Sequence, residues 1–156
     1  MRLLPLALIL AASAAGAETL QDRLFPSNVS CYLRYYNEDH LAAHPAQQVA
    51  SVQIGPEYYS FGQSPLQLRV VMNRRGDFQE FRAQAYCDDD GKALNCQLEG
   101  DAGAFRLEPG RDGALRLSVA PRGMSFEADT GFLTLDGQKA DDRVFLLPAV
   151  PADSCP

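Results

Sequence analysis

His40 and His44 are the only two histidines in the chain, and they stand four residues apart. On a helix this spacing places both imidazoles on one side, where they could bind Zn²⁺ or Cu²⁺. A zinc site needs three or four ligands, so a third would have to come from Glu38, Asp39 or a distant strand. Pro45 disfavours helical geometry at His44 and favours a capped turn whose imidazoles bond to nearby backbone. We therefore expect no bound cofactor, and a metal site at this pair is the alternative hypothesis.

The four cysteines are the second set of residues that could do chemistry: Cys31, Cys87, Cys96 and Cys155. An even number indicates two disulfides where a chain is exported, as residues 1–17 of this chain predict. Alternating apolar residues on either side of residues 88–92 predict a hairpin in which Cys87 faces Cys96 on the apolar side, close enough to bridge. Elimination then pairs Cys31 with Cys155, which would tie the start of the domain to its end.

Aromatic side chains gather in the first half of the chain. Tyrosine combines a large apolar area with a polar tip and is enriched at binding surfaces. The alternative is that these rings cover one end of a β-structure, since aromatic residues are common in strands. The candidate contact surface comprises Tyr32, Tyr35, Tyr36, Tyr58, Tyr59 and Phe61.

The N-terminus has the three-part pattern of a secretory signal peptide. Met1-Arg2 is positive, Leu3–Ala14 is apolar and uncharged, and Ala15-Gly16-Ala17 fits a signal peptidase site. The apolar run is shorter than the roughly 20 residues of a membrane span. We therefore expect cleavage near Ala17, a periplasmic or secreted location, a single domain over residues 18–156 and no membrane span in the mature chain.

Period-two alternation of apolar and polar residues dominates the chain from residue 47 onward. It predicts strands with one buried face and one wet face. The alternating segments are 66–72, 105–108, 115–119, 124–127 and 133–135, and the predicted turns between strands are 88–92, 100–103, 109–113, 121–123, 129–131 and 136–137. The fold class is therefore all-β, an antiparallel meander closing into a small barrel or sandwich of about eight to ten strands.

Two short helical turns are expected before the strands dominate. Thr19 is a suitable N-cap for residues 20–24, and Asp39 for residues 40–44. Pro26 and Pro45 then end the two turns.

Charge and missing motifs limit the functions open to the chain. A formal net charge of −6 repels phosphate backbones, so nucleic acid is a poor partner and a basic protein or a cation is a better one. The sequence contains neither Gly-x-Ser-x-Gly nor His-Glu-x-x-His, two common signatures of hydrolytic enzymes. We therefore expect a protein that is not an enzyme.

Cys31 with residues 40–49, residues 99–105 and residues 141–147 form a pattern that resembles uncharacterised exported proteins of Gram-negative bacteria. This resemblance implies export and one continuous domain, and no function. The chain is also similar in architecture to periplasmic inhibitors of C-type lysozyme, which are small disulfide-linked β-barrels that bind a basic enzyme. The Ser-Gly-x-x-Tyr and Tyr-x-x-x-Thr-Lys-Gly motifs of those inhibitors are absent here.

Three functional hypotheses follow from the sequence. The leading one is a non-enzymatic periplasmic binding or interaction protein, inhibitor-like in action, that uses an acidic surface bearing tyrosines. The second is a divalent-metal binder through His40 and His44. The third is a carrier that holds a small ligand inside the barrel.

Overall fold

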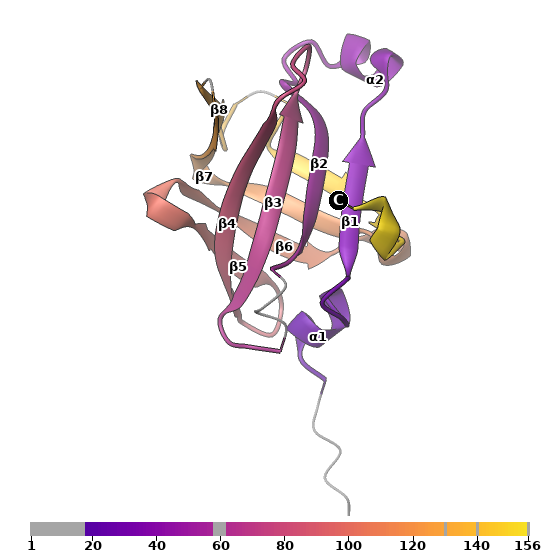
Figure 1. Ribbon diagram of the computed structural model, residues 1–156, viewed down its shortest axis with the longest axis vertical. Coiled ribbons are helices and arrows are strands. Elements are labelled where there is room, and N and C mark those ends of the chain that lie inside the picture. The colour runs from indigo at the N-terminus through magenta and orange to yellow at the C-terminus, as the bar shows by residue number, and fades with distance from the viewer. Residues whose placement is uncertain (1–17, 58–61, 130, 140, 156) are drawn as a thin grey trace, which may run out of the picture.

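The computed structural model describes residues 18–57, 62–129, 131–139 and 141–155 (Figure 1). Its helices are α1 (Leu20–Leu24) and α2 (Glu38–Ala43), with short 3-10 segments η2 (Glu99–Asp101), η3 (Arg111–Gly113) and η4 (Ala152–Ser154). No helix in these ranges is both long and apolar enough to cross a membrane. The strands are β1 (Cys31–Tyr35), β2 (Val49–Pro56), β3 (Leu66–Arg74), β4 (Glu80–Asp89), β5 (Leu94–Leu98), β6 (Gly103–Pro109), β7 (Leu115–Ala128), β8 (Gly131–Leu135), β9 (Val144–Leu147) and β10 (Ala149–Val150).

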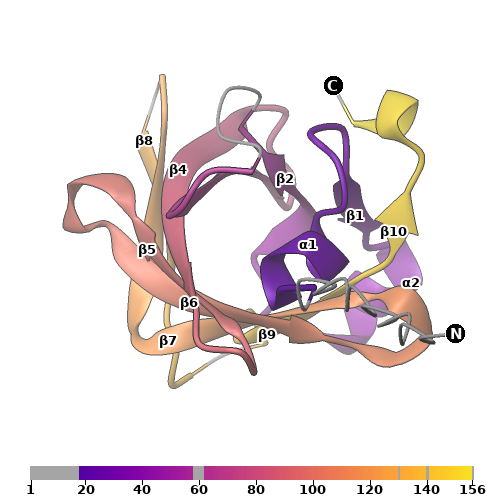
Figure 2. The same cartoon turned by 90° about the horizontal axis from the view of Figure 1, so that it is seen from below.

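The strands form a closed barrel. Strands β1 to β7 follow one another as an antiparallel meander, each paired with the next. The ring closes because β9 pairs with β7 and β10 pairs with β1, with Pro148 between β9 and β10 (Figure 2). Beyond the ring, β8 pairs with the second half of β7, which also pairs with β4 through Arg82 and Glu127. The predicted antiparallel meander is confirmed, and the structure is a barrel rather than a sandwich.

Both predicted disulfides are confirmed. In the β4–β5 hairpin Cys87 lies opposite Cys96, and their Cα atoms are 4.1 Å apart. Cys31 at the start of β1 bonds to Cys155, 124 residues later, across a Cα–Cα distance of 6.4 Å. The first bond therefore fastens one hairpin, and the second fastens the C-terminal segment to the ring.

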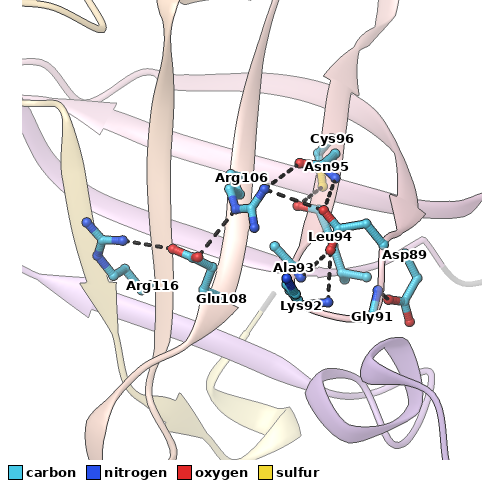
Figure 3. A network of polar contacts seen from close by, with 11 residues as sticks. Asp89, Gly91, Lys92, Ala93, Leu94, Asn95, Cys96, Arg106, Glu108 and Arg116 are labelled. Carbon is cyan, nitrogen blue, oxygen red and sulfur yellow. Dashed lines mark hydrogen bonds and ion pairs between the residues drawn. The ribbon is translucent and has the colours of Figure 1, made fainter.

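The β4–β5 turn is held by a chain of polar contacts (Figure 3). The Asp90 carboxylate accepts hydrogen bonds from the N–H groups of Lys92 and Ala93 and from the Asn95 side chain. Arg106 on β6 extends the network from Asn95 toward β7. Hydrogen bonds, first of all the one from Asn95, lower the pKa of Asp90 to about 2. The turn predicted at residues 88–92 therefore joins β4 to β5, and hydrogen bonds to Asp90 stabilise it.

The turn predicted at residues 121–123 is wrong, because β7 runs through these residues without reversing. The register between β6 and β7 shifts between Gly103 and Phe105, which marks a bulge in β7. Gly123 adopts a φ of 83°, and a bulge tolerates the missing N–H of Pro121. Pro121 and Gly123, which predict a turn, therefore form a bulge within β7. Before the bulge β7 pairs with β9, and after it β7 pairs with β8.

The interior of the barrel is filled by one cluster of buried apolar side chains that includes Phe81, Phe126 and Phe145. Helix α1 lies at the end opposite α2 and adds Leu20 and Leu24 to this cluster (Figures 1 and 2). The predicted N-cap of α1 at residue 19 is confirmed by a capping box with residue 22. A ligand held inside the barrel would have to displace these side chains, so we do not adopt the interior carrier as the function.

Candidate binding site

Helix α2 positions both histidines at the end of the barrel remote from α1 (Figure 1). The Asn37 side chain accepts a hydrogen bond of 2.9 Å from the His40 N–H, so Asn37 is the N-cap and the predicted N-cap, Asp39, is wrong. Asp39 instead lies in the first turn, where its charge suits the helix N-terminus. His44 is the C-cap, and its N–H donates to the His40 carbonyl at 3.0 Å. One short helix therefore holds both imidazoles.

The two imidazoles form a stack with the Tyr36 ring, which follows β1. The ring centroids of Tyr36 and His40 are 4.7 Å apart at an interplanar angle of 28°. Those of His40 and His44 are 4.4 Å apart at 27°. The Arg34 guanidinium carbon lies 5.5 Å from the Tyr36 centroid, within range of a cation–π contact. The end of β1 and the whole of α2 thus contribute to one aromatic cluster.

Gln47 fixes the proton on His40. The Gln47 Nε2 donates to the Val49 carbonyl at 2.7 Å, which turns the Gln47 Oε1 toward His40. The His40 Nε2 lies 3.0 Å from that oxygen. Because Oε1 can only accept, His40 Nε2 carries the hydrogen of this contact, and Nδ1 of the neutral ring is an acceptor. This hydrogen bond holds the middle ring of the stack in one orientation.

A half-open pocket of about 240 Å³ lies beside the stack, between β1, α2 and β9. It has a polar side on β1 and α2 and an apolar side on β9. The His44 Nδ1 faces the Asp141 carboxylate across it at 3.8 Å. The lining residues are Arg34, Tyr36, His40, His44, Gln47, Asp141, Val144, Phe145 and Leu146.

Tyr36 in the pocket and the nearby Asp142 have shifted pKa values. Burial raises the pKa of Tyr36 to about 12, with the nearby Arg34 charge acting downward and the Asp142 charge acting upward. Burial also raises the pKa of Asp142, although its carboxylate accepts hydrogen bonds from the N–H groups of Gln48 and Val49 at 2.6 and 3.2 Å. Asp142 therefore fastens the start of β2 to the loop before β9, and Tyr36 stays neutral at physiological pH.

The histidine pair as it stands lacks the geometry of a metal chelate. A metal–nitrogen bond of about 2.0–2.1 Å lies in the plane of each imidazole, and two nearly parallel rings stacked at 4.4 Å direct no pair of nitrogens at one point. Among the described residues, no group of three or more His, Cys, Asp or Glu side chains could hold a metal ion. Metal binding by His40 and His44 would require rotation of a ring, and it stays a prediction.

The structure separates the tyrosines that the sequence groups together. Tyr32 is buried in the core, and its hydroxyl donates to the Leu24 carbonyl at 2.6 Å, so it belongs to no exposed surface. Tyr35 points outward with 71% of its area exposed, and Tyr36 lines the pocket. The remaining predicted contact residues lie outside the described part of the chain: Tyr58, Tyr59 and Phe61.

An exposed apolar patch adjoins the pocket on the outer wall of the barrel. The pairing of Tyr32 with Ala149 continues through the Leu33 N–H, which donates to the Pro148 carbonyl at 3.1 Å. The same register, continued for two more residues, would place Tyr35 opposite Leu146, and β1 and β9 are in contact. Leu146 and Val144 are 43% and 46% exposed. We call Tyr35, Val144 and Leu146 the β1–β9 patch.

Several site residues were missed from the sequence: Arg34, Gln47, Asp141, Val144 and Leu146. One signal was present. The strand Val144-Phe145-Leu146-Leu147 is apolar at every position, although only Phe145 and Leu147 face the core. A strand on the wall of a barrel with apolar residues on both faces indicates an outer surface that serves contact.

No protein-family model, curated protein or solved structure matches this chain. The resemblances to exported Gram-negative proteins and to lysozyme inhibitors therefore stay predictions, and the functional argument rests on the geometry of the site.

Proposed function

We propose that this chain is an exported, non-enzymatic binding protein that captures a partner protein with the β1–β9 patch. The observation that carries the proposal is the exposure of three side chains with large apolar area on two strands in contact, Tyr35 on β1 and Val144 and Leu146 on β9. Burying such side chains against a partner contributes about 25 cal/mol per Å² of apolar area removed from water. A tyrosine beside aliphatic residues is a common centre of a protein interface.

The net negative charge of the chain favours a basic partner protein. The chain has 20 acidic and 14 basic residues, so its long-range field attracts a basic protein and repels an acidic one. Close to the patch the charge is mixed, since Arg116 on β7 pairs with Leu146 in the register. The net charge would therefore speed encounter, and the patch would supply the contact area.

Export is supported by the N-terminal residue pattern and by the two disulfides. Disulfides persist in the periplasm and outside the cell and are rare in the cytosol. We therefore place the partner in the periplasm or the medium.

Capture by immobilised protein tests this function. Wild-type chain, a Tyr35→Ser, Leu146→Ser double variant and a Phe132→Ser control are exposed to an extract of the exported proteins of the source organism. Phe132 on β8 is 65% exposed and lies outside the patch. Its replacement by serine therefore also removes exposed apolar area, but at a different place on the surface. We expect the double variant to lose at least about tenfold in capture, as removal of about 1.4 kcal/mol of contact energy requires, and the control to keep it. Equal capture by all three proteins would contradict the proposal.

A further inference from the structure

Arg34 is an arginine without an acidic partner in the described part of the chain. The ion pairs of Arg74, Arg82, Arg106 and Arg116 each involve a nearby carboxylate. No described carboxylate or other acceptor lies within hydrogen-bond distance of Arg34, although acidic residues outnumber basic ones in this chain. Its contact with the Tyr36 ring holds the guanidinium in place and uses none of its five N–H donors.

The backbone directs Arg34 toward the mouth of the barrel. Arg34 pairs with Val52 in the register of β1 and β2, and paired residues on neighbouring strands share a face of the sheet. Val52 is completely buried in the core, so the shared face is the inner one. Arg34 lies near the end of β1, where this face opens into the pocket. The unpaired charge thus lines the half-open pocket.

The other walls of the pocket restrict what can pair with this charge. The β9 side supplies half-exposed aliphatic carbon from Val144 and Leu146. Asp141 supplies a negative charge on the side near His44. A ligand with one negative charge can turn that charge toward Arg34, whereas a multiply charged anion would also meet the Asp141 carboxylate.

We propose that this pocket binds a small aromatic monocarboxylate. The carboxylate pairs with the guanidinium of Arg34 through two parallel N–H···O hydrogen bonds, the geometry that arginine favours. The apolar ring of the ligand lies along Val144 and Leu146, and Asp141 repels the reversed orientation. The Nε2–H of His40 is engaged by Gln47, and its ring is stacked between Tyr36 and His44, so His40 is not the donor to the ligand.

The test is a nuclear magnetic resonance titration of the disulfide-bonded mature chain with benzoate. Both histidines of the chain line the pocket, so every imidazole signal reports on it. We expect benzoate to shift the His40 and His44 signals in a saturable way. Benzamide has the same ring without the charge and should bind at least about tenfold more weakly, because it loses a charge-assisted pair. Acetate and inorganic phosphate should bind at least about tenfold more weakly than benzoate, since acetate lacks the ring and phosphate carries extra charge.

Two arginine variants locate the binding charge. Arg34→Gln should weaken benzoate binding at least about tenfold, and Arg82→Gln should leave it unchanged. Arg82 is a suitable control because it is exposed and paired with Glu80, away from the pocket. Absence of saturable benzoate shifts, equal binding of benzamide or phosphate, or full binding by Arg34→Gln would each overturn the proposal. The comparison of benzoate, benzamide, acetate and phosphate on the wild-type protein tests the proposal even where a variant does not fold. It uses no partner protein, so its outcome is independent of the proposed function.

Discussion

Tyr36 occupies a position in which a neutral hydroxyl is favoured over a phenolate. Its ring is packed against His40 and lies near both Arg34 and Asp142. Burial is the largest of the effects on the hydroxyl and raises its pKa from 10.0 to about 12. The pKa of Tyr36 therefore reports on whether its ring is buried beside the pocket as described.

The raised pKa of Tyr36 predicts how stability depends on alkaline pH. The folded state keeps the phenolic proton between pH 10 and about 12, where the unfolded state releases it. The contribution of the Tyr36 hydroxyl to the free energy of unfolding is therefore complete below pH 10 and is lost as the pH rises toward 12. We expect the free energy of unfolding, measured by urea titration, to fall less steeply over this range in Tyr36→Phe than in the wild type.

Tyr32 should contribute to the same alkaline loss of stability as Tyr36. Burial also raises the pKa of Tyr32, so Tyr36→Phe should retain part of the decline. Absorbance titration of the phenolates should show one group fewer ionising near pH 12 in the variant. Loss of one group near pH 10 instead of near pH 12 would mean that Tyr36 is not buried.

The bulge in β7 is the element that depends most on glycine. Gly103 has a φ of 116°, and a Cβ there would lie 2.7 Å from the Met124 Cα and closer still to the Gly123 carbonyl oxygen. Gly91 has a φ of 81°, and a Cβ there would meet no atom within 4 Å. These two glycines share a positive φ and differ in crowding.

Alanine substitution at the two glycines should therefore have unequal effects. Gly91→Ala should cost about 1–2 kcal/mol of unfolding free energy from backbone strain alone. Gly103→Ala should cost about 1–3 kcal/mol more than that, because the β6 and β7 backbones must separate. Urea unfolding of both variants measures the difference. Equal losses would show that the bulge does not bring the two strands into close contact.

Element by element, the sequence predicts regular strands well and irregular ones poorly. Alternation alone located β3 and the β4–β5 hairpin, including the facing cysteines 87 and 96. It failed at Pro121 and Gly123, since a bulge and a turn use the same residue types. The sequence predicts Asp39 as the N-cap of α2, whereas the structure has Asn37. Both residue types are good N-caps, and only the path of the backbone distinguishes them.

At the scale of the whole molecule, the two disulfides should contribute unequally. The Cys31–Cys155 bond closes a loop with a sequence separation of 124, and the Cys87–Cys96 bond one of 9. In the chain-entropy model these loops correspond to about 5 and about 3 kcal/mol. We expect the Cys31→Ala, Cys155→Ala variant to lose more unfolding free energy than the Cys87→Ala, Cys96→Ala variant. The opposite ranking in urea unfolding would contradict this expectation.

The candidate site could be predicted only in part, because it forms where the ring of strands closes. The spacing of His40 and His44 pointed to one helix and one side of it, and the structure places both there. Arg34 and Leu146 meet across the β1–β9 junction, which joins residues more than a hundred positions apart. No local pattern encodes that junction, so the charge and the apolar wall of the pocket emerge only from the closed barrel.

Site-specific photo-crosslinking in the native cell tests the central claim most directly. A photoreactive residue is placed at position 35 of the full chain, and in a second protein at position 132. The account predicts a crosslinked partner from position 35, on the β1–β9 patch, and none from position 132 on β8. A partner crosslinked from position 132 and none from position 35 would contradict it.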